Sequence, residues 1–145
     1  MKNSILTGVG FIGAFIASLY GGWTEAMTTL FIFMALDYIT GLIVAGVFHK
    51  SPKTATGTLE SRAGRKGLIR KGVIMAIVLV GHRIDLAFGT TYIKDGVCIA
   101  FIANELISLI ENAGLMGVYV PPIISKSIDL LNKKGEGEDG KIISS

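Results

Sequence analysis

The sequence predicts an all-α integral membrane protein with four short transmembrane helices and both termini on the cytoplasmic side. Half of the 145 residues are hydrophobic and only 17% are charged, and the mean hydropathy is +0.59. A water-soluble domain of this size needs more polar surface, so a lipid bilayer is expected to cover the excess apolar area. The apolar residues fall into four segments, and most basic residues lie between the second and the third. This distribution indicates membrane topology.

The first apolar segment, residues 5–20, has 16 uncharged residues and would span roughly 24 Å as a helix. A secretory signal peptide is the alternative, although Lys2 alone gives it a weak positive end. The row Gly13, Ala17 and Gly21 lets helix backbones approach closely, either within the chain or between copies. A parallel row of small residues contains Gly10, Ala14, Ser18 and Gly22.

The second segment, residues 26–48, is the best candidate span, and Asp37 is its one charged residue. Asp37 falls near the midplane, where insertion of an acidic residue costs about 2.5 to 3.5 kcal/mol. Thr40 and Gly41 follow three and four positions later, so the three residues share one helix face. We interpret this face as a polar contact between helices; a proton or cation site is the alternative.

The third and fourth segments, residues 68–82 and 96–112, are shorter than the roughly 20 residues that a bilayer prefers. Three spans with one re-entrant piece are therefore an alternative to four. The fourth segment carries a polar stripe that is expected to face another helix, a second copy or water. The residues of this stripe are Asn104, Glu105, Ser108, Glu111 and Asn112.

The loop before the third segment is strongly basic and is expected on the cytoplasmic side by the positive-inside rule. Its basic residues are Lys50, Lys53, Arg62, Arg65, Lys66, Arg70 and Lys71. With four spans, all but two of the 14 Lys and Arg residues lie inside, the exceptions being Arg83 and Lys94. We expect this loop to face lipid head groups, with Arg70 and Lys71 reaching up to them, and expect no nucleic-acid partner.

The chain is expected to form one transmembrane domain over residues 1–132. After Pro121 and Pro122, apolar and polar residues interleave over 123–131, which favours a short amphipathic helix on the inner leaflet or a plain solvated stub. Residues 133–145 are rich in glycine and charge and are expected to form a disordered, flexible tail.

The sequence contains no motif typical of an enzyme or a cofactor site. It has no phosphate-binding loop, no His-Glu-x-x-His and no Gly-x-Ser-x-Gly. His49 and His82 lie far apart without a set of neighbouring ligands, so no metal is expected. Cys98 is the single cysteine and is expected to be a packing residue. We therefore expect neither catalysis nor a cofactor.

Four pieces of the sequence resemble the small holins of phages and of toxin-secretion loci in Gram-positive bacteria. The resemblance covers roughly residues 30–133, and its most specific part is Asn-Glu-x-Ile-Ser-x-x-Glu-Asn at 104–112. The other strings are Leu-Asp-Tyr-Ile-Thr-Gly at 36–41, the basic run 64–71, and the exit through Gly114, Gly117 and Pro121. The first segment and the acidic tail lie outside the resemblance.

The resemblance implies a protein that accumulates in the bacterial cytoplasmic membrane, oligomerises suddenly and opens a lesion. A cell-wall-degrading endolysin, or in some loci a toxin, then leaves the cytoplasm. The expected partners are further copies of the chain and the bilayer. Two alternatives stay open: a small proton-coupled transporter that uses Asp37 and Glu105 as a relay, and a scaffold that recruits a partner through the basic loop.

Overall fold

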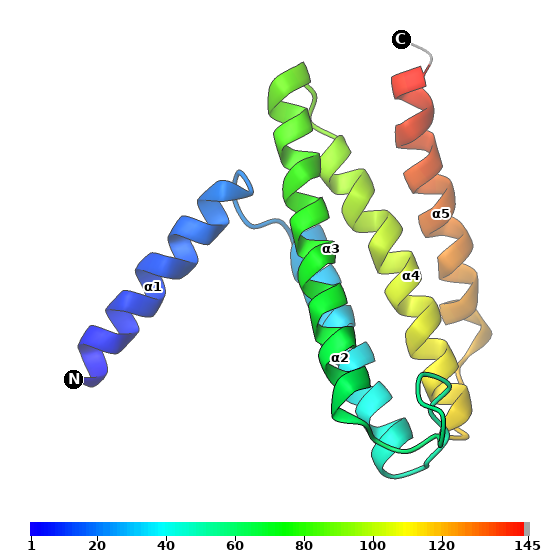
Figure 1. Ribbon diagram of the computed structural model, residues 1–145. Helices are drawn as coiled ribbons and strands as arrows, with labels where there is room; N and C mark the ends of the chain where they lie inside the picture. Colours follow the sequence, from blue (N-terminus) through cyan, green and yellow to red (C-terminus); the bar gives the residue numbers. More distant parts are fainter. Residues whose placement is uncertain (144–145) are drawn as a thin grey trace.

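The computed structural model describes residues 1–143, and within them all regular elements are α-helices (Figure 1). The helical fold class is therefore confirmed. The five helices are α1 (Lys2–Leu19), α2 (Glu25–Gly46), α3 (Ser61–Phe88), α4 (Ile93–Leu115) and α5 (Pro122–Ile143).

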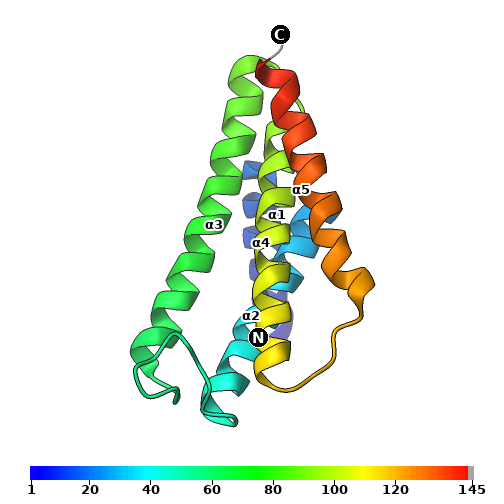
Figure 2. The ribbon, with the colours of Figure 1, turned by 90° about the vertical axis from the view of Figure 1, so that its right-hand side faces the viewer.

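Helices α2, α3 and α4 run up and down beside one another, and α5 returns along α4 (Figures 1 and 2). Helix α4 packs against α2, α3 and α5, whereas α2 and α3 contact each other little. The core between them contains Met27, Leu30, Val78 and Cys98, whose side chains are fully buried. Cys98 is thus a packing residue.

Local sequence explains where several helices begin and end. Thr24 caps α2, because its hydroxyl accepts a hydrogen bond from the amide of Met27 at 3.3 Å. Helix α3 ends at Gly89, which adopts a left-handed conformation with φ of 66°. Helix α3 begins at Ser61, well before the expected residue 68, because Arg and Lys favour helix and do not interrupt it.

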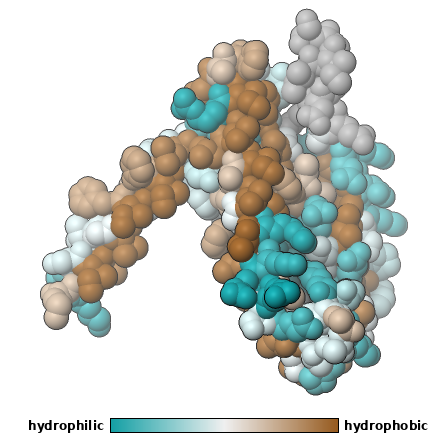
Figure 3. Space-filling view, in the orientation of Figure 1, coloured by the Kyte–Doolittle hydropathy of each residue, from teal (hydrophilic) through white to brown (hydrophobic). Residues whose placement is uncertain are grey.

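Among the described residues, only α1 and α2 are long and apolar enough to cross a membrane by themselves. Helix α3 begins with a basic stretch that forms a hydrophilic surface at one end of the bundle, while α1 is apolar (Figure 3). Helix α4 carries Lys94, Asp95, Glu105 and Glu111. The membrane class is supported, and the four spans stay a prediction.

Helix α5 differs from the expected short amphipathic helix and irregular tail. It continues to Ile143, so the residues from 133 to 143 are helical. The reason is packing along α4: Leu131 lies against the core, and Gly135 is buried beside Ile99. Of the apolar residues expected on the inner leaflet, Ile128 and Leu131 are half-buried, whereas Ile123, Ile124 and Leu130 stay exposed. Residues 144–145 of the expected tail lie outside the described residues.

Helix α1 leaves the bundle at an angle and buries none of its residues (Figure 1). Open space surrounds Gly10 and Gly13, so most of the small-residue rows make no contact within the chain. Gly21 is the exception, because a Cβ atom there would lie 2.3 Å from the ring of His82. Its φ of 71° also favours glycine. Gly21 therefore permits the close approach of the first turn to α3.

Candidate functional site: a buried charge cluster between three helices

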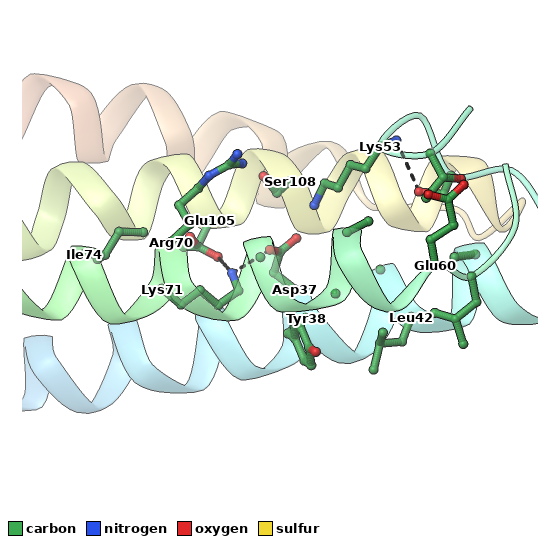
Figure 4. A pocket seen from close by; sticks show the side chains of 18 of the residues that line it. Asp37, Tyr38, Leu42, Lys53, Glu60, Arg70, Lys71, Ile74, Glu105 and Ser108 are labelled. Carbon is green, nitrogen blue, oxygen red and sulfur yellow. Dashed lines mark hydrogen bonds and ion pairs between the residues drawn. The ribbon is translucent and has the colours of Figure 1, made fainter. Parts of the chain in front are cut away.

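One lysine and two carboxylates meet between α2, α3 and α4 (Figure 4). The Nζ atom of Lys71 lies 2.7 Å from Oδ2 of Asp37 and 2.6 Å from Oε2 of Glu105. The side chains are 14%, 6% and 5% exposed, respectively. We call Asp37, Lys71 and Glu105 the charge cluster. It ties together three helices that are separate in the sequence.

Two glycines bring Lys71 to this position. Cβ atoms added to Gly64 and Gly67 would lie 3.5 Å from the hydroxyl and 3.7 Å from the ring of Tyr38. The absence of side chains there leaves room for Tyr38, so the start of α3 rests against α2. Lys71 follows Gly64 and Gly67 at helical spacing on the same face. It therefore points into the bundle toward Asp37.

Asn112 completes the hydrogen bonding of Asp37. Its amide nitrogen donates to Oδ1 of Asp37 at 3.1 Å, to the Asp37 carbonyl at 3.3 Å and to the Thr40 hydroxyl at 2.9 Å. The Thr40 hydroxyl in turn donates to the carbonyl of Leu36 at 2.8 Å. Both carboxylate oxygens of Asp37 are thus hydrogen bonded, as a buried charge requires.

The charge cluster has one more potential negative charge than positive charge. Burying ionised groups costs several kcal/mol each, and good geometry returns this cost only in part. Removing one partner of a buried pair costs about 3 to 5 kcal/mol, because the other charge stays buried. The cluster is therefore stable with all its members present and sensitive to any loss or added water.

The structure brings together only part of the predicted polar stripe. Asn112 reaches Asp37, Glu105 reaches Lys71, and Gly41 lies beside Asn112. Ser108 is half-buried, and Asn104 and Glu111 are exposed on α4. Helical geometry explains this division, since a stripe of five positions is too wide to face one neighbour. A polar strip is left on the outside of the bundle.

Sequence reasoning assigned Lys71 to the basic loop and missed its role in the cluster. The other members of that run are exposed in the structure: Lys50, Lys53, Arg62, Arg65, Lys66 and Arg70. Lys71 was expected to reach the head groups, but a nearer pair of carboxylates holds it. The signal that identifies it is its spacing from Gly64 and Gly67, which places it on the packed face of the helix.

A cavity of about 160 Å³ lies between the charge cluster and the loop that joins α2 to α3. Asp37, Lys71 and Glu105 line it, together with Arg70 of α3 and Lys53 of the loop (Figure 4). The cavity is large enough for several water molecules. Water and small ions from the loop side therefore have a short route to the charge cluster.

A second polar centre, also missed, lies at the opposite end of the bundle and involves Asp85 and Lys94. The Asp85 carboxylate accepts hydrogen bonds from the Thr90 hydroxyl, the Ile93 amide at 3.0 Å and the Lys94 amide at 2.9 Å. The Nζ atom of Lys94 donates to the carbonyl of Tyr20 at 2.8 Å. Lys94, expected in an outer loop, is thus buried in the first turn of α4.

Asp85 lies beyond the expected third span, and its surroundings alter its acidity. Burial raises the pKa of the carboxyl group, but the hydrogen bonds from Lys94, Thr90 and Ile93 outweigh burial and lower the pKa below its usual value. The ionised carboxylate therefore caps the free amides at the start of α4. This centre joins the turn after α1 to the turn after α3.

Comparison with known proteins gives relatives that match most of the chain. An uncharacterized protein of Halalkalibacterium halodurans is 35% identical over 90% of this chain and 92% of its own length. An uncharacterized 14.9 kDa protein in the nagH 3′ region of Clostridium perfringens is 32% identical over 91% of this chain and 96% of its own length. A probable holin of Bacillus phage phi105 is 26% identical over 83% of this chain and 84% of its own length.

No solved structure matches the chain. The model of the bacteriophage holin family matches residues 14–133, which contain the charge cluster, Asn112 and the basic loop. The resemblance seen in the sequence is therefore confirmed. This chain belongs to the bacteriophage holin family.

Proposed function

We propose that the protein is a holin that oligomerises in the bacterial cytoplasmic membrane and opens a timed lesion for an endolysin or a toxin. The observation that carries this proposal is the buried charge cluster of Asp37, Lys71 and Glu105 in a member of the holin family. The likeness to the probable holin of phage phi105 supports it.

The charge cluster gives a physical reason for two states. In the closed bundle, the charged groups lose their hydration, and only their mutual contacts compensate for that loss. If the helices separate around water, the same side chains regain hydration and can line a lumen. The cluster therefore holds the resting bundle together while lowering the cost of a hydrated, assembled state.

The polar strip on α4 favours assembly over a lone bundle in lipid. Glu111 is exposed on α4, and Asn104 is exposed at the cavity that it lines together with the charge cluster. Contact of either side chain with lipid is costly. Contact with a second copy or with water in a lumen removes that cost. A change in membrane potential would bias the transition by about 2.3 kcal/mol per charge moved per 100 mV.

The test is inducible expression in a bacterial host, with and without a co-expressed cytoplasmic endolysin. Culture density and membrane potential are recorded together. We expect abrupt depolarisation at a reproducible time and lysis only when the endolysin is present. Continued growth with an intact potential and no endolysin release would contradict the proposal and favour the transporter or the scaffold.

A further inference from the structure

We propose that an apolar groove between α2 and α3 receives helix α1 of a second copy of the chain. The groove has a volume of about 510 Å³. It exists because α2 and α3 contact each other little, although both pack on α4. Its lining includes Phe31, Met34, Leu68, Gly72 and Met75.

The lining of the groove is apolar and suits a helix without charged residues. Besides apolar side chains, the groove is lined by Tyr38 and by Lys71 of the charge cluster. The ammonium group of Lys71 is bound to Asp37 and Glu105, so an occupant of the groove would contact apolar surface. Because helices in lipid associate through close packing, small residues on both partners favour that contact.

Helix α1 has the properties of such an occupant. It is uncharged from Asn3 to Leu19 and buries no residue. Open space surrounds Gly10 and Gly13 on α1, and also Gly72 on the groove. These positions are also at matching depth, because Gly21 lies against His82. Gly72 lies ten positions before His82, while Gly13 lies eight positions and Gly10 eleven positions before Gly21.

The chain's own α1 is held away from its groove. The Tyr20 hydroxyl donates to the carbonyl of Met75 at 2.9 Å, so the Tyr20 side chain lies between the end of α1 and α3. Lys94 fixes the Tyr20 carbonyl from the other side. A swing of α1 into its own groove would disturb both contacts. The views in Figures 1 and 2 show α1 projecting away on the side of α2 and α3 that is opposite to α4.

This exchange has a definite symmetry. Each copy offers α1 and accepts the α1 of another copy at a different surface, so the contact is heterologous. Such contacts produce rings when the rotation closes and open chains when it does not. The inference rests on the proposed function for its purpose, since it names the contact through which copies would assemble into a lesion.

Disulfide cross-linking in membranes tests the exchange. In a Cys98→Ala background, two differently tagged copies are co-expressed, one with Gly13→Cys and the other with Gly72→Cys. After oxidation, we expect a heterodimer band on a non-reducing gel. The matched control replaces Gly72→Cys by Val73→Cys, which is at the same depth but outside the groove and is 52% exposed. The control is expected to lose the band.

Two further arms make the result decisive. A doubly substituted copy, Gly13→Cys with Gly72→Cys, is diluted with an excess of cysteine-free copies. An intrachain bond that persists on dilution would overturn the exchange, because it would place α1 in its own groove. A second cross-link joins Gly13→Cys of one copy to Leu68→Cys in the groove of the other. Adding Gly72→Leu to the accepting copy should abolish this cross-link, whereas adding Gly114→Leu, also at an open position, should leave it intact.

The same strains, without oxidant, are followed for depolarisation and endolysin-dependent lysis. Lysis on schedule with no Gly13–Gly72 heterodimer would overturn the exchange and leave the proposed function standing. A heterodimer with no depolarisation would support the exchange and contradict the lesion. The two failures are therefore distinguishable.

Discussion

Replacing Lys71 with methionine removes the one cation that joins Asp37 to Glu105 while keeping most of the side-chain volume. The two carboxylates would then face each other in a largely buried site. Breaking a buried pair in this way costs about 3 to 5 kcal/mol, which corresponds to roughly 10²- to 4 × 10³-fold in the ratio of resting to separated bundle. We therefore expect Lys71→Met to depolarise cells well before the wild type does.

The assay records the time from induction to depolarisation in cells with equal amounts of protein in the membrane, measured by immunoblot. Lys66→Met is the matched control, because Lys66 belongs to the same basic run but is exposed; it should keep the wild-type schedule. The triple variant Asp37→Asn, Lys71→Met, Glu105→Gln should return toward that schedule, since no unpaired charge is left.

A second measurement covers the case in which Lys71→Met does not accumulate. Unfolding of the purified protein by a denaturing detergent should then show a lower stability for this variant than for Lys66→Met, and recovery in the triple variant. Equal timing and equal stability of the two lysine variants would refute the reasoning, because the cluster would then contribute nothing to the resting bundle.

Three further predictions use the same unfolding measurement. Asn112→Ala removes the amide that donates to the cluster and should lower stability by about 1 to 3 kcal/mol, whereas Asn104→Ala, at an exposed position, should change it little. Gly21→Ala places a Cβ atom 2.3 Å from the ring of His82 and should destabilise the protein, with partial rescue by His82→Ala. A Gly21→Ala variant with wild-type stability would contradict the contact. The lowered pKa of Asp85 means that its ionised form stabilises the fold above the unfolded value of about 3.9. Stability should therefore fall as the pH drops from that value through the lower folded pKa, and Asp85→Asn should lose this part of the pH dependence.

Much of the architecture could be predicted from local patterns. Helix α2 follows from its apolar run and the single Asp37, and the shared face of Asp37 and Thr40 follows from helical periodicity. The polar character of α4 was likewise evident from Glu105 and Asn112. These features depend on residues a few positions apart, where spacing alone determines which side chains share a face.

The remaining features depend on contacts between distant segments. Lys71 is one basic residue in a run of several, and only the packing of Gly64 and Gly67 against Tyr38 selects it for the bundle interior. Helix α5 continues past residue 132 because α4 offers it a surface near Ile99. Asp85 and Lys94 act on backbone groups, which leave no pattern in the sequence.

The centre formed by Asp85, Lys94 and Tyr20 gives the bundle a mechanical polarity. It fastens the first turn to the third by hydrogen bonds at one end, whereas at the opposite end the start of α3 rests on α2 through the packing of Gly64 and Gly67 on Tyr38. The helices are therefore held more firmly at the end near Tyr20 than at the end near the basic loop. A force on that loop would separate the loop ends of α2 and α3 first. Water would then reach Lys71 while the contacts around Tyr20 still held the helices together.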